Sequence, residues 1–243
     1  EHWARRRGDA TALRDHRQRL SYREYNASAN RYAALLSLCG IGHGDVVAVL
    51  MQNRVEVITL VTGTVKLGAA AGMLNYQQRG DVLAHSLSLI EPRALVVGTE
   101  CGEAFESVRH RLPGSLRDRV FWLGDGEHES IDGLRDLATE AAERAAANPE
   151  TTGEVTTSDP AFHIFTSGTT GLPKAAVMSH GRWLRAMYGV GLASMRMRHD
   201  DVLYCPLPLY HNNALTLSWG AALGAGATLA IGRKFSASGF WKE

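Results

Sequence analysis

The chain has 243 residues, of which 45% are apolar, so it can bury a sizeable core and is not expected to be disordered. Its 26 basic residues nearly balance its 25 acidic ones, which argues against a nucleic-acid binder that relies on a basic surface. Its three cysteines include no C-x-x-C pair, so neither a zinc site nor a disulfide framework is expected, and a reducing, intracellular setting is the default. The N-terminus has no apolar stretch of the signal-peptide type and no initiator Met, and we expect the chain to be a fragment.

Strands and helices are expected to alternate along the first part of the chain. Ser21 to Glu24 form a capping box, and apolar positions from Tyr25 to Leu36 then recur at the spacing of one helix face, up to Gly40. Buried strands are expected at residues 46–51, 68–74, 94–97 and 120–123, and further helices at 55–67, from a cap at Asp81 to Ile90, and at 132–147. This alternation predicts an α/β fold with mostly parallel sheets packed between helices.

A polar, turn-rich stretch from Asn148 to Pro160 interrupts this alternation. We interpret residues 148–159 as a linker between two halves of one domain, about 1–147 and 160–243. Residues 214–232 carry no charge and are long enough to cross a bilayer, but they are rich in Gly, Ala, Ser and Thr. We therefore expect a buried helix, a tight turn at 224–226 and a strand at 228–231 there.

The segment best suited to chemistry is a loop between two expected strands, residues 162–165 and 175–178. It reads Thr166-Ser167-Gly168-Thr169-Thr170-Gly171-Leu172-Pro173-Lys174. Its glycines let the backbone curl around a ligand, its hydroxyl groups donate and accept hydrogen bonds, and its successive N–H groups can form an anion-binding nest. Lys174 adds a positive charge suited to phosphate. The spacing differs from that of a Walker A loop, and the plain alternative is a Ser/Thr-rich hairpin turn.

This loop resembles the phosphate loop of the adenylate-forming (AMP-binding) superfamily, which includes acyl-CoA synthetases, firefly luciferases and peptide-synthetase adenylation domains. The resemblance implies that the β- and γ-phosphates of ATP are contacted by Thr166, Ser167, Gly168, Thr169, Thr170, Gly171 and Lys174. It also implies that Lys174 is catalytic and that Thr169 helps to hold Mg²⁺. The helix expected after the loop carries Trp183 and Tyr188, for which we expect core packing.

Three further segments resemble motifs of the same family. Residues 201–211 resemble the motif beside the carboxylate, which implies a substrate pocket formed by Tyr210, His211, Asn212, Asn213 and Ala214. Residues 75–79 with His85 resemble an upstream motif, with Gln78 where Leu is more usual. Residues 234–241 resemble the K-F-S-A-S-x-F-W string of the very-long-chain acyl-CoA synthetase and fatty-acid transport protein branch.

The expected pocket departs from that branch in one respect. Asn212, Asn213 and Ala214 stand where small residues ending in Gly are usual, so a larger or more polar wall could shorten or re-aim the acyl tunnel. His211 has two open readings, a hydrogen-bonded core residue and a pocket residue. A general-base role is not expected, because a carboxylate needs no deprotonation at neutral pH.

The resemblance implies that residues 1–243 are an incomplete AMP-binding domain of a fatty acid–CoA ligase, without its C-terminal domain. Such an enzyme joins a long or very long fatty acid to AMP and then passes the acyl group to CoA, with ATP, Mg²⁺ and CoA as cofactors. The piece alone is expected to have little or no ligase activity. The open alternatives are a ligase for another carboxylic acid, a fatty-acyl-AMP ligase and, in another class, a fatty-acid transport or binding protein.

The expected partner is a fatty acid and not a nucleic acid. The expected location is the cytoplasm, with peripheral contact to a membrane as an additional option. The acyl chain length, the oligomeric state and the acceptor, CoA or a carrier protein, are not determined by the sequence.

Overall fold

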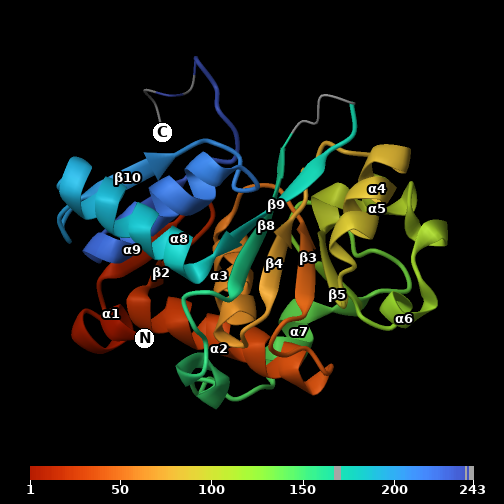
Figure 1. Ribbon diagram of the computed structural model, residues 1–243, viewed down its shortest axis with the longest axis horizontal. Coiled ribbons are helices and arrows are strands. Elements are labelled where there is room, and N and C mark those ends of the chain that lie inside the picture. Colours follow the sequence, from red (N-terminus) through yellow and green to blue (C-terminus); the bar gives the residue numbers. More distant parts are fainter. Residues whose placement is uncertain (167–170, 239, 241–243) are drawn as a thin grey trace.

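Two β-sheets and the helices around them make up the computed structural model, which describes residues 1–166, 171–238 and 240 (Figure 1). The larger sheet has the strand order β7 (Arg135–Asp136), β6 (Val120–Leu123), β5 (Ala94–Gly98), β3 (Val46–Leu50), β4 (Ala70–Met73), β8 (Pro160–Thr166) and β9 (Lys174–Ser179). All neighbours in it are parallel except β8 and β9. The predicted α/β class with mostly parallel strands is confirmed.

The smaller sheet joins the two ends of the chain. Its strand order is β10 (Val202–Cys205), β11 (Thr228–Ile231), β1 (Thr11–Arg14) and β2 (Arg19–Ser21). The pairs β10–β11 and β11–β1 are parallel, and β1–β2 is antiparallel. Each of the predicted halves contributes strands to both sheets, so the division between the sheets does not coincide with the linker at residues 148–159.

Helices cover the sheets on several sides. The α-helices are α1 (His2–Arg6), α2 (Tyr22–Leu38), α3 (Val55–Lys66), α4 (Gly80–Ile90), α5 (Gly102–Glu106), α6 (Gly114–Arg117), α7 (Leu137–Ala142), α8 (His180–Ala186) and α9 (Gly220–Ala225). Short 3₁₀ turns occupy η1 (Thr99–Cys101), η2 (Arg109–Arg111) and η3 (Glu150–Gly153), and π-helical segments occupy η4 (Met187–Ser194) and η5 (Asn213–Trp219).

The central strands are apolar throughout because both faces of the larger sheet are covered. In β3, Val47 and Val49 join the core cluster that includes side chains of α2 and α3. Ala48 and Leu50, which alternate with them, join the cluster that includes side chains of α4 and α5. A parallel strand buried on both faces reads as a continuous apolar run, and this is why such runs identified the strands in the sequence.

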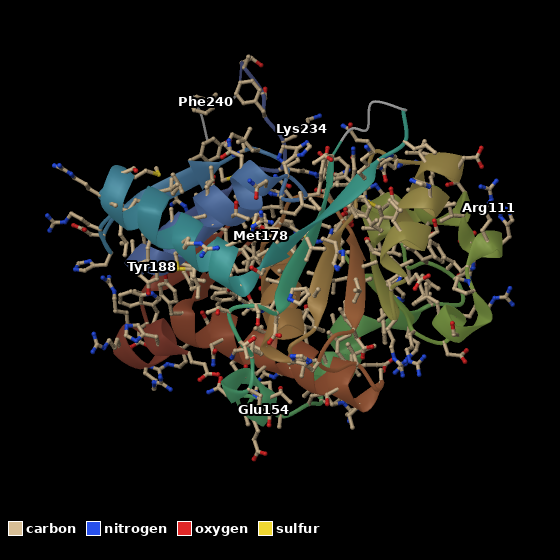
Figure 2. The ribbon with its side chains drawn as sticks, viewed as in Figure 1. Arg111, Glu154, Met178, Tyr188, Lys234 and Phe240 are labelled. Atoms are coloured by element: carbon tan, nitrogen blue, oxygen red, sulfur yellow. The ribbon has the colours of Figure 1, made fainter. Side chains whose placement is uncertain are left out.

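Two predicted helices have different boundaries, and one predicted side-chain environment is wrong. Helix α4 begins at Gly80 after Arg79, and Asp81 lies inside its first turn, where its carboxylate pairs with Arg111. The helix expected over 132–147 is only α7, because Asp136 pairs in β7 and its carboxylate caps the helix that follows. Tyr188 is 57% exposed and is not a core residue (Figure 2).

Several other predictions of secondary structure and packing are confirmed. The capped helix α2 carries the expected reciprocal bonds between Ser21 and Glu24. Trp183 is buried and packs against Phe162 and Trp219. The expected helix and strand are present as η5, α9 and β11, but the turn begins at Gly226 and not at Gly224, because α9 continues to Ala225. None of the helices in the described part of the chain is long and apolar enough to span a membrane.

The expected linker is fastened to the helices through Lys66, at the end of α3. The Lys66 Nζ donates to the side-chain oxygens of Asn26 at 2.8 Å, Asn30 at 2.6 Å and Asn148 at 2.9 Å. Asn30, which is fully buried, also donates to the Asn148 oxygen at 2.9 Å. Burial lowers the pKa of the Lys66 amine. The linker is therefore held by a buried charge whose three donors are all used.

Replacing Lys66 by Met should lower the free energy of unfolding by about 1–3 kcal/mol, because the amide oxygens of Asn26, Asn30 and Asn148 lose this donor and Asn30 is fully buried. Urea unfolding followed by circular dichroism would measure it. The matched control is Lys174→Met, which removes an exposed lysine and should change the stability by no more than about 0.5 kcal/mol. Equal effects of the two substitutions would contradict the role given to Lys66.

Candidate functional site

The predicted phosphate loop connects the antiparallel strands β8 and β9. Thr166 and Lys174 are register partners at the ends of these strands, so they face each other at the base of the loop. The β8–β9 hairpin projects beyond the larger sheet at the top of Figure 1. Both residues are exposed, as is Gly171, whose φ of 85° lies in the left-handed region that favours glycine.

The remaining predicted loop residues lie outside the described residues: Ser167, Gly168, Thr169 and Thr170. The site is therefore argued from the two ends of the loop and from the segments that contact them. The exposed positive charge of Lys174 at the mouth of the hairpin suits an anionic ligand. The hydroxyl group of Thr166, opposite it, can donate a hydrogen bond to the same ligand.

His85, on α4, holds the end of the loop. Its Nε2 lies 3.1 Å from the carbonyl oxygen of Pro173, and it donates because that oxygen can only accept. Pro173 immediately precedes Lys174. The helix that carries His85 therefore contacts the predicted phosphate loop directly, although the two residues are 88 positions apart in sequence.

Tyr76 connects the same upstream motif to the expected substrate pocket. Its ring packs edge-on against that of Tyr210, with 5.3 Å between the centroids. Tyr210 in turn contacts His211, with 4.4 Å between their centroids. Burial raises the pKa of both phenol groups, so Tyr76 and Tyr210 are neutral at ordinary pH.

The three motif segments therefore meet at one edge of the molecule. The segments that carry Tyr76 and Tyr210 follow the carboxyl ends of β4 and β10, and Thr166 is the last residue of β8. The carboxyl ends of parallel strands are where open α/β sheets bind ligands. The arrangement can place an anion at the hairpin mouth next to a wall of aromatic side chains.

The expected pocket residues differ in their exposure. His211, Asn212 and Asn213 are exposed, whereas Ala214 is fully buried and belongs to the main core. His211 is thus not a buried core histidine. Its assignment as a pocket residue stays a prediction. Asn212 and Asn213 follow Tyr210 and His211 in the sequence and present polar groups at the surface.

Asn53 was missed by the sequence reasoning and positions the pocket segment. It is 4% exposed and stands just before α3. Its Nδ2 donates to the carbonyl oxygens of Leu207 at 2.8 Å and Gly232 at 3.1 Å. Its Oδ1 accepts from the backbone N–H of Leu209 at 2.8 Å. The only signal in the sequence is a polar residue between an apolar strand and an apolar helix.

One group of potential metal ligands occurs in the described ranges, formed by Asp125, Glu127 and His128. The Asp125 carboxylate already accepts hydrogen bonds from the Thr99 hydroxyl and from the backbone N–H groups of Glu127 and His128. The Asp125 Oδ2 also lies 2.7 Å from the ring Nδ1 of His128. These bonds shape the loop itself, and we assign the group no metal.

Comparison with known proteins places the chain among enzymes and transport proteins of one family. All of residues 1–243 match the family described as AMP-binding enzyme. The medium/long-chain-fatty-acid–CoA ligase FadD6 of Mycobacterium tuberculosis is 46% identical over 240 residues, which cover 99% of this chain and 38% of that protein. Long-chain fatty acid transport protein 6 of Mus musculus is 37% identical over 225 residues, covering 92% of this chain and 35% of that protein.

A solved structure agrees with these relatives. The inhibitor-bound N-terminal domain of FACL13 from Mycobacterium tuberculosis matches with a TM-score of 0.85 and 29% identity, covering 99% of this chain and 57% of that one. The chain thus spans less than two fifths of the length of FadD6 and of the mouse transport protein.

His85→Ala should weaken ATP binding by about fivefold to tenfold, because the loop end loses its anchor; a tenfold change corresponds to about 1.4 kcal/mol. Isothermal titration calorimetry with the full-length protein would measure the affinity. Ser88→Ala, which removes an exposed hydroxyl on the same helix, is the matched control. His85→Gln retains a donor and should lose less. Unchanged affinity in His85→Ala would show that this contact does not position the loop.

Proposed function

Because the chain belongs to the AMP-binding enzyme family, we propose that it carries the phosphate-binding and acid-binding part of an ATP-dependent fatty acid–CoA ligase. The observation that supports this most directly is the β8–β9 hairpin, with Lys174 exposed at its mouth. The same edge of the molecule holds the pocket segment around Tyr210. A phosphate group and an acyl chain can therefore be held side by side.

The proposed chemistry has two steps. In the first, a carboxylate oxygen of the fatty acid attacks the α-phosphorus of ATP, a new P–O bond forms, and the bond to pyrophosphate breaks. In the second, the CoA thiol gives up its proton, its sulfur attacks the acyl carbon, and AMP leaves. A fatty acid or an aryl acid could enter the same first step, and the second step could use a carrier protein in place of CoA.

The residues of the loop act on the first step in this proposal. Lys174 stabilises the negative charge that builds on pyrophosphate, and Thr166 donates a hydrogen bond from the opposite strand. Ser167, Gly168, Thr170 and Gly171 supply further contacts to the β- and γ-phosphates. We also propose that the Thr169 hydroxyl contributes to an Mg²⁺ site, where the metal would neutralise phosphate charge. The support for Thr169 is its place in the loop.

Fatty-acid transport or binding is the second candidate function. The specific observation in its favour is the likeness to a protein named long-chain fatty acid transport protein 6. A binding protein would use the pocket around His211, Asn212 and Asn213 without any transfer of adenylate. Acid-dependent pyrophosphate exchange separates the two candidates, because only the ligase catalyses it.

We further propose that the protein works in the cytoplasm and contacts membranes at their surface. Three apolar side chains on or just after η4 are exposed: Tyr188, Leu192 and Met195. Exposed Arg185, Arg196 and Arg198 lie next to them in the sequence. Apolar side chains flanked by arginines suit the interface of an anionic lipid surface.

Leu192→Glu should reduce co-sedimentation with vesicles of anionic phospholipid by about tenfold, because a charge replaces an inserted apolar group; tenfold corresponds to about 1.4 kcal/mol. The matched control is Leu89→Glu, another exposed leucine, on α4. If both variants sediment with vesicles as the unaltered protein does, this surface is not the contact.

Lys174→Ala should lower fatty-acid-dependent ATP–pyrophosphate exchange in the full-length protein by about tenfold or more, the loss of roughly 1.4 kcal/mol of transition-state stabilisation. Arg117→Ala, which removes an exposed charge on α6, should leave exchange unchanged. Removal of Mg²⁺ with a chelator should abolish exchange, and added Mg²⁺ should restore it. Exchange with aryl acids but not with fatty acids would reject the fatty acid as the substrate. No exchange with any acid would favour the transport or binding function.

A further inference from the structure

Asn212, which follows Tyr210 and His211 in the expected pocket segment, is held by a contact with Thr216. Asn212 is exposed and immediately precedes η5. The Thr216 hydroxyl lies 2.6 Å from the Asn212 backbone oxygen and 2.8 Å from its side-chain oxygen, and its single proton is shared between these two acceptors. Thr216 itself is 1% exposed. A group on the pocket surface is thus tied to a hydroxyl that belongs to the core.

The bond to the side-chain oxygen distinguishes this threonine from the others. Thr59 and Thr64 also donate to the backbone oxygen four residues earlier, at 3.0 Å in each case, which is an ordinary contact within a helix. Thr216 does this and also holds the Asn212 carboxamide. Because its oxygen faces Thr216, the Nδ2 group of that carboxamide is directed away from the helix. No acceptor for Nδ2 occurs among the residues described.

The local backbone gives a second, independent indication. Residues 213–219 form a π-helical segment, a rare conformation that occurs frequently at functional sites. Asn212 is the residue at which the chain enters this segment. The segment is buried on its inner side through Ala214, Leu215 and Trp219. The backbone of Asn212 is therefore positioned by the buried segment that follows it, and its side chain by the hydrogen bond from the Thr216 hydroxyl.

A fixed, solvated amide N–H affects which acyl chains can pass it. An apolar chain that covers Nδ2 removes its water and offers no acceptor, and leaving a polar group unpaired in this way is unfavourable. A chain that ends before Asn212 leaves the water in place. The paired rings of Tyr76 and Tyr210 offer such a chain an apolar wall.

We propose that Thr216 is a positioning residue that holds Asn212 as a polar stop, so that the protein prefers medium-length over very long unsubstituted fatty acids. This inference rests on the proposed function, because it takes the segment from Tyr210 to Ala214 as the wall of the acid-binding pocket. Asn212 touches the acyl chain, and Thr216 acts only through Asn212.

The test compares decanoate with eicosanoate in the full-length protein, by kcat/KM for pyrophosphate exchange. Thr216→Val keeps the shape of the side chain and removes the hydroxyl, so that the Asn212 carboxamide can turn aside. The preference for decanoate should fall by about tenfold in this variant, equivalent to roughly 1.4 kcal/mol. Thr216→Ser keeps the hydroxyl and should keep the preference. Asn212→Ala, at an exposed position, should reduce the preference as Thr216→Val does.

The outcomes separate this inference from the proposed function. An unaltered protein without any preference for decanoate overturns the polar stop, as does an Asn212→Ala variant whose preference is unchanged. If Thr216→Ser loses the preference as fully as Thr216→Val, the hydroxyl is not what positions Asn212. If the unaltered protein shows no exchange with any fatty acid, the proposed function fails, and the inference falls with it.

Discussion

The three hydrogen bonds of the buried Asn53 carboxamide hold together the edge at which the candidate site forms. Asn53 stands after β3 of the larger sheet, and its partners Leu207 and Gly232 follow β10 and β11 of the smaller one. A buried carboxamide that lost one partner would leave a backbone group unpaired, at a cost of about 1–3 kcal/mol. The two sheets are thereby joined at their carboxyl ends, and the segment with Tyr210 is placed against Tyr76.

The parts of the fold that the sequence predicted are those whose cause is local. The capping box at Ser21 needs only residues up to Glu24, and the buried strands β3 and β5 are recognised by their unbroken apolar runs. The failures have tertiary causes. Residues 132–147 have a helical composition, but Asp136 pairs in β7 with the neighbouring strand. The short strands β1 and β2 carry no apolar run and were not predicted. They belong to a sheet in which β1 pairs with β11, more than 200 residues later in the sequence.

The candidate site was predictable to a similar degree and for the same reason. The loop from Thr166 to Lys174 is a continuous string, so its flanking strands could be inferred from residue types in order, and its phosphate-binding role stays a prediction. The contacts that place it could not be inferred in this way. The bond from His85 to Pro173 and the packing of Tyr76 against Tyr210 join residues far apart in sequence, and the anchoring by Asn53 gives almost no local signal.

The pairing of β1 with β11 has a consequence for synthesis of the protein on the ribosome. The indole N–H of Trp3 donates to the carbonyl oxygen of Leu223, 220 residues later, and the Tyr22 hydroxyl donates to that of Ala227, 205 residues later. At a synthesis rate of about 5–20 residues per second, these partners are made on the order of 10–40 s after the N-terminal segment. During that time its apolar side chains lack their final neighbours, so the nascent chain offers chaperones a binding site that disappears once β11 has emerged.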